Sequence, residues 1–406
     1  MRRSGAGLIR SLRSYNYRLW AVGALISNIG TWTQRTAQDW LVLTHLSHRS
    51  ASVMGLVMAF QFGPQLLLLP WTGSAADRFD RRRLLMATQA AMGGLALGLG
   101  ALTISGAVEL WHVYVFAFLS GCAAAFDAPV RQTFVAELVG DEDLPNAVAL
   151  NSTLFTSAQM VGPAVAGLTI TAIGTGWAFV IDGASFGAVL VCLCLLRTRE
   201  FHHNARASRA GGTFVEGLRY VWGRPDLMTI LLTLFMIGTF GMNFPIFIST
   251  MAVGVFHSDA RGFGLLSSIM AVGTLSGALA AATRRAIGSG SLLGGAGVFG
   301  LGCTVAALAP GYWLFAAALA VTGAALLTFA NATNGLMQLT TEPSMRGRVM
   351  ALRISIALGC KPVGAPVVGW VADAFGPRWA LAVAAASGFA AAAAVFLPPS
   401  FRLKGR

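Results

Sequence analysis

Ionisable side chains inside long apolar stretches are the residues of this chain that could do chemistry. Arg35 and Asp39 stand four residues apart, so on a helix they share one face and can pair. Asp127 and Arg131 repeat this spacing, whereas Asp182 has no base near it in the sequence. A charge at the depth of a membrane is costly and is a functional candidate by default. The binding and release of protons is the chemistry that such carboxylates could perform.

Each of these groups also has a structural interpretation that the sequence leaves open. Asp39 either titrates from the outer side or only balances Arg35. The pair of Asp127 and Arg131 either serves a gate or holds its own helix in place. Asp182 is either a proton carrier or a hydrogen-bonded structural carboxylate.

Lys361 is the most unusual residue, because it stands near the middle of an apolar segment beside Pro362. A buried lysine must pair, lose its proton or face a watery cavity. We expect Lys361 to face a central cavity, where it contacts an anionic group of a substrate or a carboxylate from the first half of the chain. Snorkelling is disfavoured so far from either end of the segment.

The composition indicates which elements must position these residues. Of the 406 residues, 11% are charged and 55% are hydrophobic, whereas about 25% of a soluble domain is charged. A helix of about twenty apolar residues crosses a bilayer. Twelve such segments are predicted, at about 18–45, 52–72, 83–105, 110–131, 146–172, 176–197, 227–255, 262–283, 290–309, 311–339, 347–374 and 378–398. The chain is therefore expected to be an all-α membrane protein.

Basic residues lie unevenly in the two alternating sets of connections between these segments. One set holds most of them, at 2–18, 78–83, 197–226, 284–285, 346–353 and the C-terminus. The other set holds only Arg49, Arg261 and Arg378. Because cytoplasmic loops carry the excess of Lys and Arg, we place both termini in the cytoplasm. The net charge of +13 then follows from topology, and no nucleic-acid partner is expected.

The longest connection divides the predicted helices six and six. We predict an N-terminal half at 1–197, a cytoplasmic linker with an amphipathic segment at 198–226, and a C-terminal half at 227–406. The amphipathic segment either lies on the lipid surface or is a solvated linker.

Internal repetition supports two related halves. The chain reads VGPAVAG from Val161 to Gly167 and VGAPVVG from Val363 to Gly369. Duplicated halves of this kind are how many secondary transporters are built.

The connection after the second segment reads GSAADRFDRRR, in which Gly73 stands four residues before Asp77 and Arg78, with Arg81 and Arg82 following. This pattern resembles the loop signature of the major facilitator superfamily, which has twelve helices in two pseudo-symmetric halves. Some of the arginines in it serve only to fix topology.

The resemblance implies that Asp77 is part of a latch on the cytoplasmic side. Its carboxylate would accept from the N-terminus of the eleventh helix or pair with a base near the end of the fourth, since charge pairs can be made and broken between two states. Arg131 and Arg346 are the candidate bases.

Gly162, Pro163 and Gly167 resemble the antiporter motif of the same superfamily, although Ala149 and Ala158 replace glycines that the motif has upstream. Close helix packing and a proline kink are the structural alternative. The stretches at 126–167 and 32–43 resemble the enterobactin-exporter and macrolide-efflux branch. That branch exports siderophores, macrolides and other secondary metabolites in exchange for protons.

These observations favour a proton-coupled exporter of a small molecule in the inner cell membrane, alternating access between its two halves. A proton-coupled importer and a membrane sensor without transport are the alternatives, and an enzyme is disfavoured because the histidines have no partnered nucleophile. The expected partners are a small-molecule substrate, protons and the lipid bilayer, with a monomer as the default. No cofactor, nucleotide or metal is expected, because neither a phosphate-binding loop nor a ligand spacing occurs.

Overall fold

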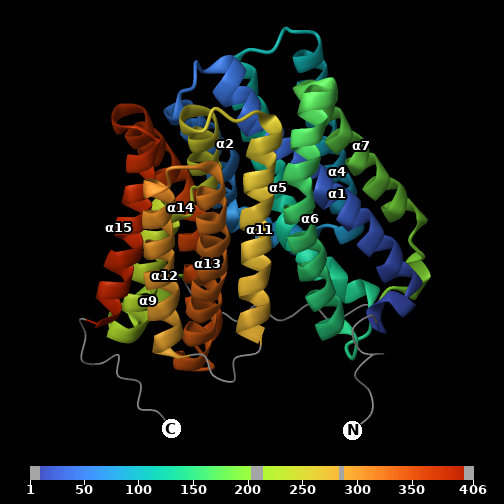
Figure 1. The fold of residues 1–406 in the computed structure, drawn as a ribbon. Helices are drawn as coiled ribbons and strands as arrows, with labels where there is room; N and C mark the ends of the chain where they lie inside the picture. Colours follow the sequence, from blue (N-terminus) through green and yellow to red (C-terminus); the bar gives the residue numbers. More distant parts are fainter. Residues whose placement is uncertain (1–9, 203–213, 283–287, 397–406) are drawn as a thin grey trace. The chain divides into compact units, whose positions relative to one another are not determined.

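The structure is a computed structural model that describes residues 10–202, 214–282 and 288–396 (Figure 1). Every regular element in these ranges is a helix. Ten helical segments, of 19 to 31 residues each, have the length and apolar composition needed to cross a membrane. The prediction of an all-α, multi-pass membrane protein is therefore confirmed.

The first two predicted spans differ from the ten in composition and continuity. Helix α1 (Tyr15–Leu41) is long but carries many polar side chains, and a π-helical turn at Val42–Leu46 continues it. The second span consists of α2 (Ala51–Leu67) and α3 (Leu69–Arg78). The break at Leu68 lies two residues before Pro70, which has no N–H to donate to the carbonyl of Leu66 one turn earlier.

The predicted loop between the second and third spans is wrong in extent. The chain stays helical as far as Arg78, and only Phe79 and Asp80 separate α3 from α4 (Arg81–Ile104). Asp80 makes this tight turn possible, because its carboxylate accepts a hydrogen bond from the backbone N–H of Arg83 at 2.8 Å. The predicted loop signature thus lies largely on a helix.

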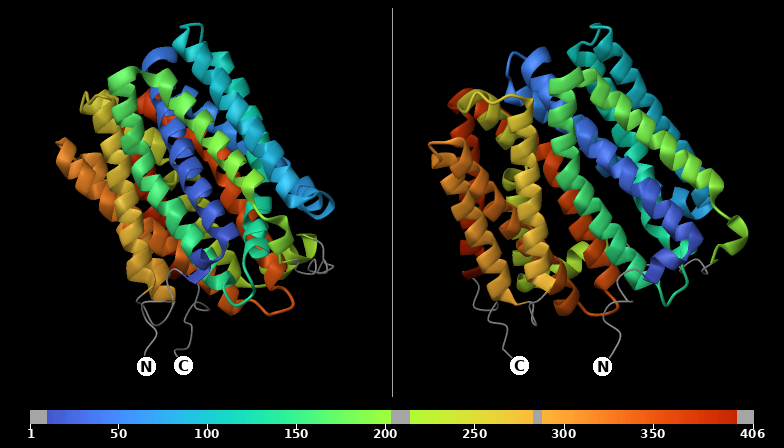
Figure 2. Two further views of the ribbon diagram at one scale, coloured as in Figure 1. Left: turned by 90° about the vertical axis from the view of Figure 1, so that its right-hand side faces the viewer. Right: turned by 45° about the vertical axis from the view of Figure 1, so that its right-hand side comes forward.

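By their contacts, residues 1–42 and 63–207 form one compact unit. In this first unit α1 packs against α6 (Leu144–Ile173) and α7 (Thr175–Leu195), as Figure 2 shows. Helix α4 packs against α7 and against α5 (Leu110–Leu138). The first unit therefore places α1 and α7 side by side, which brings their ionisable residues together.

Residues 43–62 and 208–406 form the second unit. Its described helices, besides the start of α2, are α8 (Phe214–Trp222), α9 (Pro225–Met236), α10 (Phe244–Thr250), α11 (Ala260–Ala282), α12 (Ser289–Leu308), α13 (Tyr312–Thr340), α14 (Arg346–Phe375) and α15 (Pro377–Phe396). In this unit α12 packs against α13 and α15, as α4 packs against α5 and α7 in the first. The predicted boundaries of the two halves stay a prediction.

The internal repeat extends beyond the two glycine-rich segments on which it was recognised. Gly174 follows α6 with a φ of 97°, and Gly376 follows α14 with a φ of 102°. Both stand at the same distance along the chain from the repeated heptapeptide, and both occupy a backbone region that L side chains rarely adopt. The two helices therefore end in the same way.

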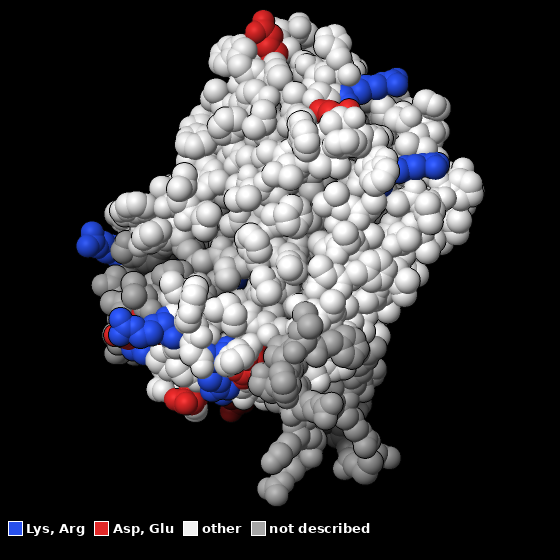
Figure 3. Space-filling view, turned by 90° about the vertical axis from the view of Figure 1, so that its left-hand side faces the viewer, with Lys and Arg blue, Asp and Glu red and all other residues white. Residues whose placement is uncertain are grey.

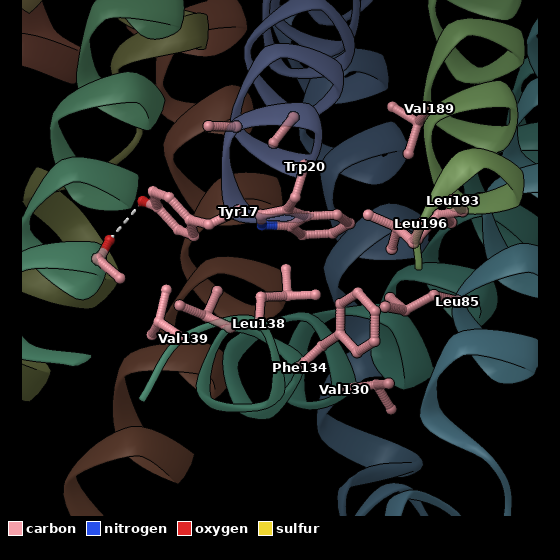
Figure 4. Packing of buried hydrophobic residues seen from close by; sticks show 14 residues of the cluster. Tyr17, Trp20, Leu85, Val130, Phe134, Leu138, Val139, Val189, Leu193 and Leu196 are labelled. Carbon is pink, nitrogen blue, oxygen red and sulfur yellow. Dashed lines mark hydrogen bonds between the residues drawn. The ribbon is translucent and has the colours of Figure 1, made fainter. Parts of the chain in front are cut away.

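A buried cluster fixes the start of α1 to α5 and α6 in the first unit (Figure 4). The rings of Trp20 and Phe134 meet edge to face with centroids 5.4 Å apart. The Tyr17 hydroxyl donates to the carbonyl of Ala147 at 2.8 Å, which satisfies the polar end of a fully buried ring. These contacts anchor the part of α1 that leads toward Arg35.

The surface of the helices is largely uncharged, and Figure 3 shows a broad white face with the charged side chains toward its two ends. In α8, Leu218 and Trp222 are exposed, whereas Gly217 packs closely on Arg348 of α14. Whether this exposed edge lies on the lipid surface or in water stays a prediction.

The positive φ of Gly376 gives a test of the repeat that does not depend on side-chain contacts. Nothing lies within 4 Å of the position that its Cβ would occupy. Gly376→Ala should therefore lower the free energy of unfolding only through backbone strain, by about 1–3 kcal/mol. Gly174→Ala should have the same effect, as measured by thermal unfolding in detergent.

Gly290→Ala is the matched control, because that glycine also has open space around it but lies in α12 with ordinary helical backbone. It should leave the protein as stable as the wild type or more stable. An equal loss in all three variants would contradict the assignment of strain to the two positive-φ glycines.

Candidate functional site

The site in the first unit is built where α1 meets α7. Gly30 makes the approach possible, because a Cβ there would collide with Ser185 and lie 2.8 Å from the Asp182 carboxylate. Asp182 has only 1% of its surface exposed. Its Oδ1 accepts from the hydroxyls of Thr31 and Ser185, each at 3.4 Å. These bonds are long, so the two hydroxyls alone satisfy the buried carboxylate poorly.

Arg35 supplies the positive charge that Asp182 lacks in the sequence. Its guanidinium interacts electrostatically with Asp182 on α7 and with Asp39, one turn further along α1. It also lies over the ring of Trp32, with 5.2 Å between Cζ and the ring centroid. One cation therefore faces two carboxylates that come from different helices.

The charges of this cluster do not balance. With both carboxylates ionised, the group of Arg35, Asp39 and Asp182 carries one net negative charge, and Asp182 is fully buried whereas Arg35 and Asp39 are half-buried. Uncompensated charge is costly where it is buried, and two acids that share one base titrate as a unit. The cluster can therefore hold one exchangeable proton, on either carboxylate.

A second polar cluster contains the other predicted pair. Arg131 donates from Nε to Asp127 at 2.9 Å, in the i, i+4 arrangement that the spacing indicates. Asp127 also accepts from Thr88 at 3.0 Å and from the Gln89 amide at 2.7 Å, both on α4. The carboxylate, 6% exposed, is thus well satisfied by partners on two helices.

Around this pair, three buried polar atoms of the described residues have no hydrogen-bond partner: Trp20 Nε1, Gln89 Oε1 and Arg131 Nη1. The Arg131 guanidinium lies 5.7 Å from the centroid of the Trp20 ring. Arg131 therefore keeps one donor for a further acceptor, which a residue that changes partners between two states requires.

The basic residues that follow Asp77 divide by their contacts. Arg81 forms a salt bridge with Glu137 at 2.6 Å, and Arg82 donates to the carbonyls of Leu193 and Cys194 at the end of α7. Arg78 is exposed. Arg81 and Arg82 therefore hold α4 to α5 and α7.

Glu137 was missed by the sequence analysis. The fourth span was predicted to end at 131, but α5 continues to Leu138 and places Glu137 in its last turn. Polar residues after Arg131 were interpreted as the membrane boundary, although a helix can extend beyond the bilayer. An acid in the last turn of a longer helix is the feature that could have identified it.

The side chains of Gly73 and Asp77 lie outside the described residues, so the predicted latch stays a prediction. Of its two candidate bases, Arg131 pairs with Asp127 and Arg346 begins α14.

In the antiporter-like segment, Gly162 packs against α1. A Cβ on Gly162 would lie 3.1 Å from the carbonyl oxygen of Ile29 and from the amide nitrogen of Thr33. The Thr33 hydroxyl also donates to the Gly162 carbonyl at 3.1 Å. Pro163 and Gly167 are buried in the same helix. The segment therefore fixes α6 to the part of α1 that leads into the site.

Lys361 belongs to the second unit and is half-buried on α14. Its Nζ lies 4.3 Å from the centroid of the Phe62 ring, at the end of the α2 segment that belongs to this unit. An ammonium over an aromatic face is stabilised while it stays charged. No group of three or more His, Cys, Asp or Glu side chains suited to a metal occurs in the described ranges.

The family model described as transmembrane secretion effector matches residues 8–404. The chain belongs to this family, within the major facilitator superfamily.

Its relatives include the multidrug efflux pump Tap of Mycolicibacterium fortuitum, 27% identical over 87% of this chain and 88% of that protein. The staphyloferrin A transporter of Staphylococcus aureus is 26% identical over 60% of this chain and 61% of that one. Macrolide efflux protein A of Streptococcus pyogenes is 24% identical over 89% and 90%.

Among solved structures, the chain is similar to a bacterial homologue of the lysosomal transporter Spinster in its inward-facing, occupied conformation. The TM-score is 0.75 with 15% identity, and the match covers 99% of both chains. A D-xylose–proton symporter gives a TM-score of 0.72 with 15% identity over 97% of this chain and 99% of that one. At such identities the likeness shows the fold, which is that of a major facilitator transporter.

The salt bridge between Arg81 and Glu137 should contribute measurably to stability. Both side chains are about one-fifth exposed, at 19% and 22%. A double-mutant cycle with Arg81→Gln and Glu137→Gln, read by thermal unfolding, should give a coupling energy of about 1 kcal/mol.

The pair of Arg197 and Glu200 serves as control, because its side chains are 61% and 49% exposed. The coupling energy of this pair should be only about 0.3 kcal/mol, since solvent screens the two charges. Equal coupling in the two cycles would contradict the structural role given to Arg81.

Proposed function

We propose that the protein is a proton-coupled exporter of a small molecule, which works by alternating access. The observation that carries this proposal is that the Arg35 guanidinium interacts electrostatically with two carboxylates, those of Asp39 and Asp182. A membrane bundle that holds one surplus acid has a place for one proton. This is the element that an exchange of substrate for protons requires.

Proton binding would act through the contact between α1 and α7. When one carboxylate takes a proton, Arg35 is left with a single ionised partner, and the attraction across the two helices changes. A ligand shifts a conformational equilibrium by the difference in its affinity for the two states. A proton that stabilises one arrangement of α1 and α7 would therefore favour one state of the transporter, and substrate would couple to it through the same equilibrium.

Export rather than import is supported by two observations. The relatives named above include a multidrug efflux pump and a macrolide efflux protein. The antiporter-like residues Gly162 and Pro163 lie against the stretch of α1 that leads to Arg35. Close packing there would transmit a change at the proton site to α6.

The orientation that we propose has both termini in the cytoplasm of a cell whose inner membrane holds the protein. It rests on the excess of arginine in one set of connections. The protein would act as a monomer in the lipid bilayer, without nucleic acid and without an enzymatic step.

The substrate would meet Lys361 as a cationic group on α14. Because the Phe62 ring stabilises the ammonium, Lys361 can offer its charge to an anionic group of a substrate.

Loss of either carboxylate should abolish coupling. In proteoliposomes screened with lipophilic cations, macrolides and catecholate siderophores, the wild type should release protons when a transported compound is added. Asp182→Asn and Asp39→Asn should each remove this proton signal, because one carboxylate balances Arg35 and no surplus acid remains.

Asp259→Asn is the matched control, since this exposed carboxylate lies outside the Arg35 cluster and caps the start of α11, accepting from the N–H of Gly262 at 2.9 Å. It should keep the proton signal. Substrate flux without proton movement in the wild type would reject proton coupling, and movement of protons and substrate in the same direction would establish import instead.

Lys361→Gln should discriminate between substrates by charge. Losing a charged hydrogen-bond partner should raise the KM of an anionic compound about tenfold. The KM of a cationic compound should not rise. Phe62→Leu removes the ring and keeps the ammonium, so its effect on the anionic compound should be smaller. A rise in KM for both kinds of compound would contradict an anion-binding role.

A further inference from the structure

Asp373, in the last turn of α14, binds the first residues of α2. Its Oδ2 accepts from the Ser50 hydroxyl at 2.7 Å and from the Ser52 backbone N–H at 2.9 Å. Its Oδ1 accepts from the Ala51 N–H at 2.7 Å. The first N–H groups of a helix have no partner inside the helix, so one carboxylate of α14 acts as the N-terminal cap of α2.

Below this cap, the two helices touch backbone to backbone. A Cβ on Gly369 of α14 would collide with Ala51, and a Cβ on Gly55 of α2 would collide with Ala365. All of these residues belong to the second unit. The glycine on each helix therefore allows α2 and α14 to pack at close distance. We call this contact the seam, and Asp373 lies at its end.

The end of α14 shares its sequence with the end of α3. Residues 369–375 read GWVADAF and residues 73–79 read GSAADRF, so Gly, Ala, Asp and Phe occupy the same four positions. In residues 73–79 the shared aspartate is Asp77, for which the sequence predicts a cytoplasmic latch. In residues 369–375 the shared aspartate is Asp373, whose hydrogen-bond partners are described above.

We propose that Asp373 is a latch on the outer side, which holds the start of α2 against α14 and must release when that side opens. The proposal rests on the alternating access and the orientation proposed above. It makes Asp373 the counterpart of the latch that the sequence predicts at Asp77: Asp373 ends α14 and caps the start of α2, and Asp77 would play the corresponding part on the cytoplasmic side. The two latches would then close opposite sides of the membrane and would not be engaged together.

The chemistry of this contact suits a reversible latch. A carboxylate at a helix N-terminus is favoured by the free N–H groups and by the helix dipole. Asp373 is exposed at the end of its helix, so water can satisfy both the carboxylate and the N–H groups after release. The contact therefore stabilises the closed state without making it permanent.

The test measures the distance across the seam in the full-length protein, without substrate and without a proton gradient. Spin labels are placed at His45→Cys and Phe375→Cys, two exposed positions that flank the latch, after replacement of the five native cysteines. Pulsed electron spin resonance then gives the distance distribution in lipid nanodiscs. Asp373→Ala should add a longer-distance population and raise the ratio of open to closed molecules about tenfold.

Two further variants keep the result interpretable if Asp373→Ala folds poorly. Ser50→Ala removes one of the three hydrogen bonds and should give a smaller shift in the same direction. Asp259→Ala removes the cap of a different helix, α11, and should leave the distances unchanged. Wild-type distances in both latch variants, or an equal shift in Asp259→Ala, would overturn the proposal.

The result is independent of the test of proton coupling. If the protein moves no protons but the distance lengthens in Asp373→Ala, the latch is supported and proton coupling is rejected. If the protein exports by proton exchange but the distances stay unchanged, proton coupling is supported and the latch is rejected.

Discussion

The shared guanidinium of Arg35 is the interaction on which the function of this protein depends. An apolar bundle tolerates a charge only where another charge or a set of hydrogen bonds compensates for it. Here two carboxylates on two helices face one base, and the hydroxyls of Thr31 and Ser185 bind Asp182 only at long distance. The cluster is therefore charge-balanced only when it carries a proton, and this requirement ties the protonation state to the packing of α1 on α7.

Several other carboxylates of the described chain are better satisfied than Asp182, and they serve to hold helices together. Asp127 has three hydrogen-bond donors, and Arg81 has Glu137. The end of α14 binds the start of α2 through one carboxylate. Such contacts at helix ends lie where water can replace them, whereas the Asp182 carboxylate is buried. Exposed contacts of this kind can break and re-form between two states, whereas the buried Asp182 is suited to exchanging a proton.

The sequence predicted the fold class well, because apolar runs of the length of a bilayer have few alternative explanations. It also predicted the pairing of Asp127 with Arg131, which depends only on helical periodicity. It did not pair Asp182 with Arg35, because these residues are far apart in the chain and only the packing of α1 on α7 unites them. The close approach needs Gly30, and a single glycine in an apolar helix gives no such signal by itself.

Helix boundaries caused the remaining differences. The predicted end of the fourth span at 131 concealed Glu137, and the predicted loop at 73–83 is mostly helix. Polar residues were taken as the ends of helices, but a helix continues into water as long as its backbone is hydrogen-bonded. The partners of Asp373 were equally hidden, since they include two backbone N–H groups that no residue type identifies.

The most direct test of the account is the infrared spectrum of the protein in lipid, titrated with pH and searched for the carbonyl band of a protonated carboxylic acid. One such band is expected from the membrane interior, removed in Asp182→Asn and in Asp39→Asn and kept in Asp127→Asn. A band that survives in both of the first two variants, or that disappears only in the third, would contradict the assignment of the exchangeable proton to the Arg35 cluster.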